Sequence, residues 1–254
     1  MSDQSNDPAT QDGSLAARGK PRVYQNTVKR LAFSILKGDF PAGHVLPPET
    51  DLCDKLGISR SALRESVRAL KDKGMLIARP RHGTIVQPRS AWHLLDADLL
   101  NWSMEVDPDA EFVFSLFEAR QVIEPAAARL SAMRATSGDI EAMEAAFADM
   151  SAAKAAGDFQ RFNEADIAFH LALLRATSNV VFIQLSNMIG TALAIAFRMS
   201  IARAHEPGES LSQHGDLIEM IRARDPIGAE NVMTRLLAVA GIDLGLSNRG
   251  PSKS

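Results

Sequence analysis

Cysteine is almost absent from this sequence. Cys53 is the only cysteine among 254 residues, which excludes an internal disulfide framework and a zinc site built on two thiolates. A metal site here must therefore use histidine and carboxylate ligands. Uninterrupted apolar runs of about 18 residues are also missing, which argues against a membrane span. The polar N-terminus, MSDQSNDPATQDGSLAARGKPR, lacks the apolar core of a signal peptide, so we expect a cytoplasmic protein.

Charge is divided unevenly along the chain, although the net charge is only −3. Between Arg22 and Arg89 there are 13 Lys/Arg against 6 Asp/Glu, whereas from Ala91 onward there are 13 against 22. This asymmetry indicates that the N-terminal segment meets a polyanion and the remainder does not. A basic excess of this kind is typical of nucleic-acid-binding domains, and an ordinary solvated basic surface would give the same count.

Residues 22–89 have the pattern of a winged helix-turn-helix domain. An amphipathic helix is expected over Val23–Lys37. Two short helices then follow, Glu49–Leu56 and a second one capped by Ser59, joined by a turn at Gly57. Two β-like runs, Leu76–Arg79 and Thr84–Val86, surround a basic tip and predict a hairpin that forms the wing.

The C-terminal region predicts an all-α bundle, so the fold class is mainly α. We expect disordered tails at 1–21 and 248–254, a linker with a short helix at 90–108, and a helical domain at 109–247. Turn signals at Thr136–Gly138, Ala156–Asp158, Ser178–Asn179, His205–Gly208 and Asp225–Pro226 divide that domain. Short connections between helices favour an antiparallel bundle, here of about six to seven helices. Pro125 should kink or end the first of them.

The predicted DNA-reading residues lie at the start of the second short helix and at the wing tip. Early positions of a recognition helix reach base edges in the major groove, and the arginine fork suits guanine. The wing-tip residues suit minor-groove or phosphate contact. The candidates are Ser59, Arg60, Ser61, Arg64 and Arg68 on the helix, and Arg81, His82 and Gly83 on the wing. Glu65 is expected to pair with a neighbouring arginine instead of touching DNA.

Two long segments resemble one family. The stretch GDFPAGHVLPPETDLCDKLGISRSALRESVRALKDKGMLIARPRHGTIVQP is similar to the winged-helix domain of the GntR family of bacterial transcription regulators. The later segments FEARQVIEPAAARL, FNEADIAFHLALL and SQHGDLIEMIRARD resemble the effector-binding domain of its FadR subgroup. The resemblance extends from about Val23 to Gly245 and implies a homodimer that reads a palindromic double-stranded DNA operator. Six of the candidates match the family's DNA-contacting positions: Ser59, Arg60, Ser61, Arg64, His82 and Gly83. Thr50 stands where some members have a DNA-contacting arginine.

The same resemblance implies a divalent metal site in the helical domain. An Asp and a His one turn apart match Asp166 and His170, and His214 matches a third ligand. The fourth ligand normally follows a Met on the last helix, and Leu236 occupies that position. Two imidazoles and a carboxylate suit zinc, nickel or manganese. Three interpretations remain open: a weak or effector-assisted metal site, a metal-free polar pocket for the effector, and a hydrogen-bond cluster in the core.

Arg120 is the second candidate for effector binding. It lies on an apolar, inward-facing stripe with Phe112, Leu116 and Ile123, where a cation needs a counter-charge. An effector carboxylate would provide that charge, and so would Glu124 or Asp166. The predicted effector site consists of Arg120, Asn163, Asp166, His170 and His214.

A narrower resemblance concerns the effector itself. SAWHLLDADLLNW and FNEADIAFH look like the branch of the subgroup that responds to sugar acids, the D-galactonate regulators in particular. The hydroxyls of such a carboxylate would be reached by Ser200, Arg198 or Ser210. We therefore expect a ligand-responsive repressor of a sugar-acid catabolic operon, and no enzymatic activity.

Three alternatives to that function remain. The first is a metal-dependent helical enzyme, which the lack of a general base at recognisable spacing disfavours. The others are regulators that sense another small carboxylate or a fatty acyl group. A fatty acyl ligand would require a long apolar tunnel in place of the polar cluster.

Overall fold

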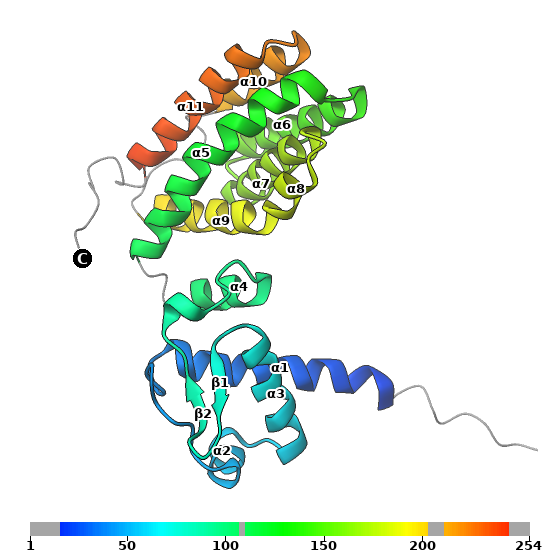
Figure 1. The fold of residues 1–254 in the computed structure, drawn as a ribbon. Helices are drawn as coiled ribbons and strands as arrows, with labels where there is room; N and C mark the ends of the chain where they lie inside the picture. Colours follow the sequence, from blue (N-terminus) through cyan, green and yellow to red (C-terminus); the bar gives the residue numbers. More distant parts are fainter. Residues whose placement is uncertain (1–15, 107–109, 203–210, 244–254) are drawn as a thin grey trace, which may run out of the picture. The chain divides into compact units, whose positions relative to one another are not determined.

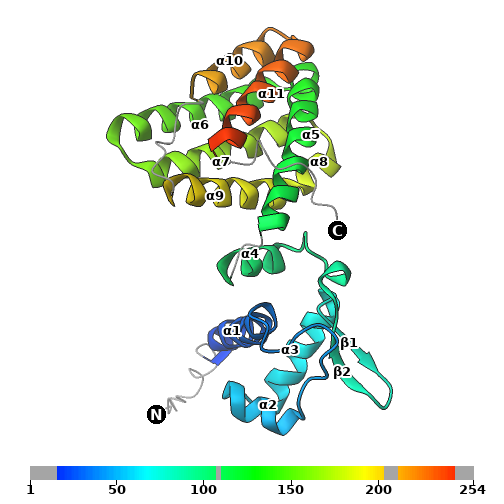
Figure 2. The same cartoon turned by 90° about the vertical axis from the view of Figure 1, so that its left-hand side faces the viewer.

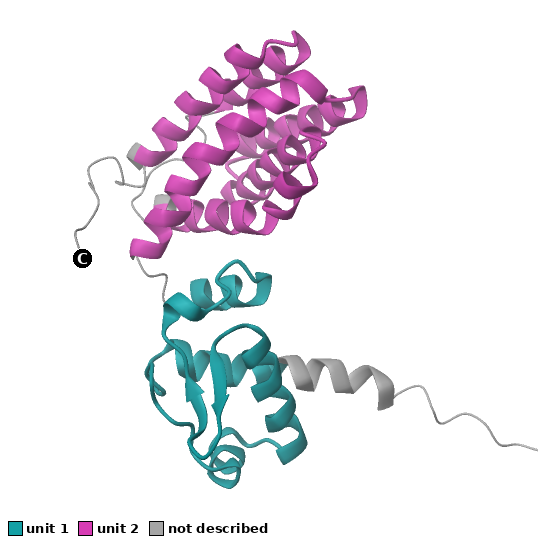
Figure 3. Cartoon of the chain, in the orientation of Figure 1, with its two compact units in different colours: residues 1–107 teal, residues 108–254 magenta. Residues whose placement is uncertain are grey.

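The computed structural model describes residues 16–106, 110–202 and 211–243. The chain divides into two compact units, Met1–Asp107 and Pro108–Ser254 (Figure 3). Helices make up most of both units, and the strands of the described residues form a single two-stranded sheet (Figures 1 and 2). The predicted mainly α fold is confirmed. Among the described residues, no helix is long and apolar enough to cross a bilayer.

The first unit has the winged helix-turn-helix order. Its elements are α1 (Ala16–Leu36), α2 (Glu49–Leu56), α3 (Arg60–Asp72), β1 (Leu76–Arg79), β2 (Gly83–Val86), the 3-10 turn η1 (Arg89–Ala91) and α4 (Ala97–Val106). Gly57 ends α2 in the left-handed conformation, at φ 62°, which a glycine adopts without steric cost. The strands pair antiparallel, with Leu76 opposite Val86, and Val45 adds an isolated bridge to Ile85.

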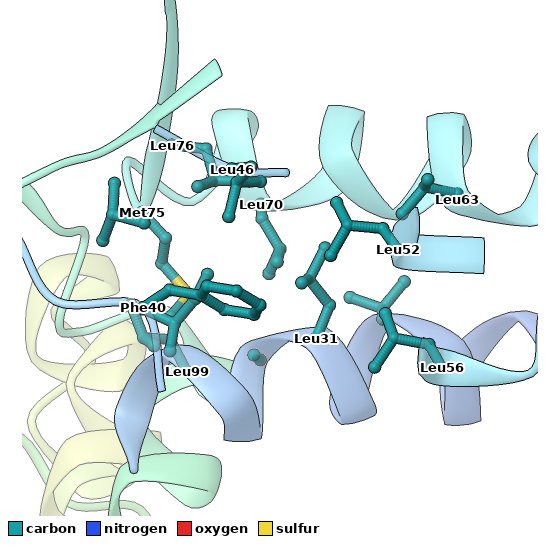
Figure 4. Close-up of a cluster of buried hydrophobic side chains, with 14 residues drawn as sticks. Leu31, Phe40, Leu46, Leu52, Leu56, Leu63, Leu70, Met75, Leu76 and Leu99 are labelled. Atoms are coloured by element: carbon teal, nitrogen blue, oxygen red, sulfur yellow. The ribbon is translucent and has the colours of Figure 1, made fainter. Parts of the chain in front are cut away.

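Leucine side chains form most of the core of this unit. α1 packs against α3 and α4, and the cluster of buried side chains drawn in Figure 4 also includes members from α2, from β1 and from the segment between α1 and α2. The labelled members are Leu31, Phe40, Leu46, Leu52, Leu56, Leu63, Leu70, Met75, Leu76 and Leu99. Leu31, Leu63 and Leu70 are buried. Removing apolar side chains from water stabilises the folded state, so this burial determines which side of α3 faces solvent.

Two expected boundaries differ from the structure. α1 begins at Ala16, so the last residues of the predicted disordered tail 1–21 are helical; residues 1–15 and 244–254 lie outside the described residues. The predicted linker 90–108 is more than a connection, because α4 belongs to the first unit and buries Leu99 in its core. The polar residues around α4 made its contribution to the apolar core hard to recognise in the sequence.

The second unit is the predicted helical bundle. Among the described residues it contains α5 (Ala110–Arg134), α6 (Ser137–Ala156), α7 (Phe159–Ala176), α8 (Val180–Gln184), α9 (Ser186–Ala202), α10 (Leu211–Arg222) and α11 (Pro226–Asp243). Most ends fall at the predicted turns: Thr136 and Asp139 form a capping box at α6, and Asp158 caps α7. The expected break at His205–Gly208 lies outside the described residues. The break at Leu185 between α8 and α9 was not predicted.

α5 occupies a central place in the bundle, since it packs against α7, α9, α10 and α11. Pro125 lies inside α5 and does not end it. A proline removes the N–H that would bind the carbonyl one turn earlier, here that of Gln121. Gln121 is exposed, so water can replace the missing donor and the helix continues.

Candidate DNA-reading surface and effector pocket

The start of α3 is held by a serine cap. The Ser59 hydroxyl accepts a hydrogen bond from the Ala62 backbone N–H at 3.2 Å and lies 3.1 Å from the Ser61 hydroxyl. Capping by serine satisfies one of the free N–H groups at a helix start. Ser59 is therefore engaged at the helix end, and Ser59, Arg60 and Ser61 are all exposed beside it.

One face of α3 presents the predicted arginines. Arg60, Arg64 and Arg68 follow each other at four-residue spacing and are exposed, so they lie on one side of the helix. Leu63 and Leu70 are buried on the opposite side. The fold thus leaves the arginine face open, as a recognition helix requires; which bases these side chains contact stays a prediction.

Arg64 has a partner that the sequence did not indicate. Its Nε lies 3.0 Å from Glu49 Oε1 and 3.1 Å from Oε2, where Glu49 is the first residue of α2. The hydrogen bond from Arg64 lowers the pKa of the Glu49 carboxyl. Glu65 had been expected to pair with a neighbouring arginine, but the partner recorded for Arg64 comes from the other helix of the motif.

The wing tip is a tight turn. Arg81 and Gly83 have positive φ angles, of 65° and 85°, and His82 Nδ1 lies 3.0 Å from the Pro80 carbonyl. Gly83 is the first residue of β2 and pairs with Arg79, one residue earlier than the expected start of the strand. Arg81, His82 and Gly83 are exposed at the end of the hairpin, which is where the prediction placed them.

The far end of α3 is tied to α4. Lys73 Nζ lies 2.6 Å from Asp96 Oδ1 and 2.8 Å from Asp98 Oδ2, and 5.4 Å from the centre of the Trp102 ring. Burial alone would lower the pKa of the Lys73 ammonium, but the two carboxylates raise it. These contacts join the end of the recognition helix to the segment that continues into the second unit.

Three helices of the second unit bring five ionisable side chains together. α5 contributes Arg120 and Glu124, α7 contributes Asp166 and His170, and α10 contributes His214. Four of these side chains are at most 2% exposed, whereas Asp166 keeps 18%. Asp166 is therefore the member of the cluster nearest to solvent.

Asp166, His170 and His214 form the predicted triad. One ligand atom from each lies within 4.8 Å of the others. The Asp166 carboxylate is 3.1 Å from His214 Nε2 and 3.8 Å from His170 Nε2, and the two imidazoles are 5.5 Å apart at 89°. Phe169 packs edge-on against His214 at 4.8 Å between ring centres and holds that ring in place.

The donor set fits a divalent metal. His170 Nε2 is buried and has no hydrogen-bond partner among the described residues, and buried polar atoms of this kind need an explanation. A carboxylate and two neutral imidazoles would supply three of the four ligands that zinc prefers. Asp166, His170 and His214 would hold the ion, and the ion would attract the oxygen atoms of an effector.

Glu124 is the counter-charge that Arg120 needs. Arg120 Nε donates to Glu124 Oε1 at 2.5 Å, and Glu124 Oε2 lies 2.5 Å from His170 Nδ1. Burial alone would raise the pKa of the Glu124 carboxyl, but the charges of Arg120 and His170 lower it to about 2. Of the three counter-charges considered for Arg120, the structure pairs it with Glu124, which the sequence had not placed in the effector site.

Asp166 is likewise held as a carboxylate. Partial burial would raise the pKa of the Asp166 carboxyl, but the contact with His214 and the charges of His170 and Arg120 lower it. Two ionised carboxylates therefore face one guanidinium.

The remaining candidates surround the cluster less tightly. Asn163 is buried on α7, one turn before Asp166, and Leu236 is 3% exposed on α11. Arg198 is exposed on α9. Ser210 and the side chain of Ser200 lie outside the described residues. The roles of these residues toward an effector stay predictions.

Comparison with known proteins identifies both units. The family of bacterial regulatory proteins called gntR matches residues 23–86, and the FCD domain matches residues 115–239. The galactonate operon transcriptional repressor of Escherichia coli (strain K12) is 35% identical over 210 residues, which are 82% of this chain and 90% of that protein. A protein named for regulation of the L-lactate dehydrogenase operon in the same organism is 32% identical over 218 residues, 84% of this chain and 82% of its own.

A solved structure supports the fold alone. Lar, which controls the expression of the Listeria monocytogenes agr system, aligns with a TM-score of 0.59 at 16% identity, over 94% of this chain and 100% of its own. The family and the relatives bear the names of transcription regulators, not of enzymes.

Proposed function

Since the chain belongs to the gntR family of bacterial regulatory proteins and combines its helix-turn-helix with an FCD effector-binding domain, we propose that it represses an operon for the catabolism of a 2-hydroxycarboxylic acid. A sugar acid of the galactonate type is the preferred effector. The acid binds at the cluster around Arg120, Asp166, His170 and His214, and its binding releases the operator.

The excess negative charge of the cluster carries this proposal. A metal ion binds only neutral imidazoles. With His170 and His214 in that form, the carboxylates of Glu124 and Asp166 exceed the guanidinium of Arg120 by one negative charge. A divalent cation reverses that excess to a single positive charge. A monocarboxylate then neutralises it, so metal and effector together make a neutral buried site, which is the state that costs least in a low dielectric.

The compounds in the relatives' names are acids of the kind that this site would neutralise. Galactonate and L-lactate, which occur in the names of two relatives, are both carboxylates with a hydroxyl on the adjacent carbon. A carboxylate oxygen and that hydroxyl can chelate one cation together, and oxygen ligands are accepted at the open positions of a three-ligand metal site. This supports a hydroxycarboxylate, since Asp166, His170 and His214 provide only three of four ligands.

The DNA-binding half of the proposal requires two copies of the chain. Two recognition helices related by a twofold axis read the two halves of a palindrome. Arg60, Arg64 and Arg68 of α3 and the wing tip provide the contacts, and we infer a homodimer that acts in the cytoplasm. An effector that binds more tightly to the DNA-free arrangement shifts the population away from the operator.

The other functions fit the site less well. A fatty acyl chain would meet Arg120, Glu124, Asp166 and two imidazoles where it needs apolar walls. Another small carboxylate remains compatible with the charge of the cluster. The comparisons do not support an enzymatic function, because the relatives are named as regulators.

A thermal-shift panel with and without chelator tests the effector. D-galactonate is compared with galactitol, which lacks the carboxylate, and L-lactate with propionate, which lacks only the 2-hydroxyl. A ligand present at about 100 times its Kd stabilises the folded protein by roughly 2.7 kcal/mol. We expect D-galactonate to raise the melting temperature, galactitol to leave it unchanged, and EDTA to reduce the effect of D-galactonate.

The same compounds are then added to a gel shift with the gene's own upstream region. D-galactonate should abolish the shifted band. If both hydroxy acids leave it unchanged and a carboxylate without a 2-hydroxyl abolishes it, the hydroxycarboxylate proposal is wrong. A stabilisation that survives EDTA in full would support the metal-free polar pocket.

A further inference from the structure

We infer that Glu124 is a positioning residue of the effector pocket, because one buried carboxylate holds Arg120 with one oxygen and His170 with the other. That these side chains bind an effector rests on the proposed function. The inference itself concerns which nitrogen of His170 faces the pocket, and this can be measured without any effector.

The two oxygens of Glu124 have separate tasks. Oε1 accepts from Arg120 Nε at 2.5 Å, and Oε2 lies 2.5 Å from His170 Nδ1. The Glu124 side chain is 1% exposed, so water cannot replace either partner. A buried carboxylate that contacts a guanidinium with one oxygen and an imidazole with the other restricts the position of both side chains.

This contact decides which nitrogen of the neutral imidazole carries the proton. A ring nitrogen and a carboxylate oxygen at 2.5 Å must share a proton, because two lone pairs at that distance would repel each other. The ring is turned from the ideal hydrogen-bond direction, since the contact does not meet hydrogen-bond geometry, but the proton still belongs on Nδ1. Nε2 is then the atom that faces Asp166, at 3.8 Å.

The orientation of His170 is the arrangement that a metal ligand needs. Histidine ligands commonly donate the second ring N–H to a carboxylate, which fixes the ring and increases its basicity. Here Nε2 points to the same space as Asp166 Oδ1 and His214 Nε2. Glu124 thereby prepares His170 to offer a lone pair to a cation without touching that cation itself.

The same carboxylate also directs Arg120. A guanidinium carries five N–H donors, and the bond from Nε to Glu124 uses one. The two Nη groups form the fork that binds a carboxylate in bidentate fashion. Glu124 therefore holds Arg120 through Nε, and an anionic effector would bind to the two Nη groups.

Nitrogen NMR of the histidine rings tests the inference on the wild-type protein. The full chain, labelled with ¹⁵N-histidine and stripped of metal, contains six histidines, and a His170→Gln variant assigns the signals of His170. We expect Nδ1 of His170 to carry a proton at neutral pH, whether the ring is neutral or charged. A neutral ring with its proton on Nε2 would overturn the inference.

A matched pair of variants tests the consequence for the pocket. Glu124→Gln retains one acceptor oxygen for Arg120 and replaces the other by an amide donor, so it can satisfy His170 only if Nδ1 becomes the acceptor and the ring proton moves to Nε2. Glu118→Gln makes the same change at an exposed position of α5. In a competition titration of Zn²⁺ against a chromophoric chelator, Glu124→Gln should bind about 10- to 100-fold more weakly, and Glu118→Gln should bind as the wild type does.

The outcomes separate this inference from the proposed function. If Glu124→Gln lowers the melting temperature but leaves zinc affinity and the His170 signals unchanged, Glu124 has only a structural role and the inference fails. If Glu124→Gln does not fold, or if the wild type binds no zinc, the wild-type NMR still decides. If the effector is not a hydroxycarboxylate, the proposed function is wrong, whereas the prediction about Nδ1 of His170 is unaffected.

Discussion

Arg64 of the recognition helix and Glu49 at the start of α2 are joined by contacts of 3.0 and 3.1 Å from one guanidinium nitrogen to both carboxylate oxygens. The Arg64 side chain is still 70% exposed and Glu49 48%. Glu49 thus holds Arg64 on the exposed face of α3 that we predict to read DNA, and also places a negative charge there. The pair orients the arginine at the cost of some attraction to phosphates, which favours specificity over general affinity.

Glu49→Gln should weaken that discrimination. Removing the carboxylate frees Arg64 and takes one negative charge from the surface, so binding to random-sequence DNA should tighten more than binding to the operator. The slope of log K against log salt should steepen by about 1. Fluorescence anisotropy with both DNAs measures this. Asp72→Asn, at the other end of α3, is the control and should change neither the ratio of operator to random-DNA affinity nor the salt slope. An unaltered affinity ratio in Glu49→Gln would contradict the orienting role.

Arg60→Ala and Arg64→Ala should each cost operator affinity. Both side chains are exposed on the same face of α3, and an arginine that binds a guanine in bidentate fashion contributes roughly 1–3 kcal/mol of discrimination. Titration of operator and random DNA gives that difference directly. Arg175→Ala removes an exposed charge from the second unit and serves as the control. If either variant binds the operator as the wild type does, the assignment of the recognition face is wrong.

Arg81→Ala should act differently, because the wing tip suits phosphates and the minor groove more than major-groove bases. Arg81 is exposed in a turn with a positive φ of 65°. We expect affinity to fall by a similar factor for operator and random DNA, and the salt slope to decrease by about 1. A loss confined to the operator would indicate direct base reading by the wing instead. His82→Ala, at the neighbouring position, shows whether the loss of affinity comes from the positive charge of Arg81 or from any change at the wing tip.

Lys73→Met should destabilise the first unit in a pH-dependent way. The pKa of Asp96 is lowered because its burial is outweighed by Lys73 and by backbone N–H groups, and the pKa of Lys73 is raised. A lowered acid pKa contributes stability that is present above the ordinary value of 3.8 and lost as the pH falls below it. A raised lysine pKa contributes stability below the ordinary value of 10.5 that is lost above it.

The difference between wild type and Lys73→Met should therefore be largest near neutral pH, at about 1 kcal/mol because the pair is partly exposed. Urea unfolding followed through tryptophan fluorescence measures it, since Trp102 lies beside Lys73. Lys71→Met removes the same charge from the same turn of α3 as a control. A difference between wild type and Lys73→Met that stays constant from pH 7 to pH 3 would show that the loss comes from packing alone.

Local signals made most of the fold predictable. Gly57, Ser59, Thr136 and Asp158 each act within one helical turn, so their effect on helix ends can be read from the residues around them. The break at Leu185 escaped because no glycine or proline marks it. The place of α4 escaped too, since a short apolar stripe does not say which core it joins.

Pairs that are distant in the sequence were not predictable in the same way. Glu49 and Arg64 are 15 positions apart and come together only because α2 and α3 cross. Asp166 and His170 are one turn apart on a helix, so their proximity was predictable, whereas His214 could be added only through a family resemblance. Glu124 was visible as a counter-charge for Arg120, but its second contact, with His170, requires α5 to pack against α7.

Leu236→His should restore the ligand that the resemblance expects. Leu236 is 3% exposed on α11, and a third imidazole nitrogen would be the fourth ligand of a tetrahedral site with Asp166, His170 and His214. Zinc affinity should rise by roughly tenfold or more. Without metal the variant should unfold at a lower temperature than the wild type, because an imidazole replaces a buried apolar side chain.

Leu237→His is the matched control for that prediction. Leu237 is 1% exposed and the next residue of the same helix, so the two variants carry the same chemical change about 100° apart around α11. Chelator competition should show higher zinc affinity only for Leu236→His, while both lose stability without metal. Equal zinc affinity in the two variants would mean that Leu236 does not face the cluster. A gain confined to Leu236→His would show that this chain keeps the geometry of a closed metal site and has left one position open.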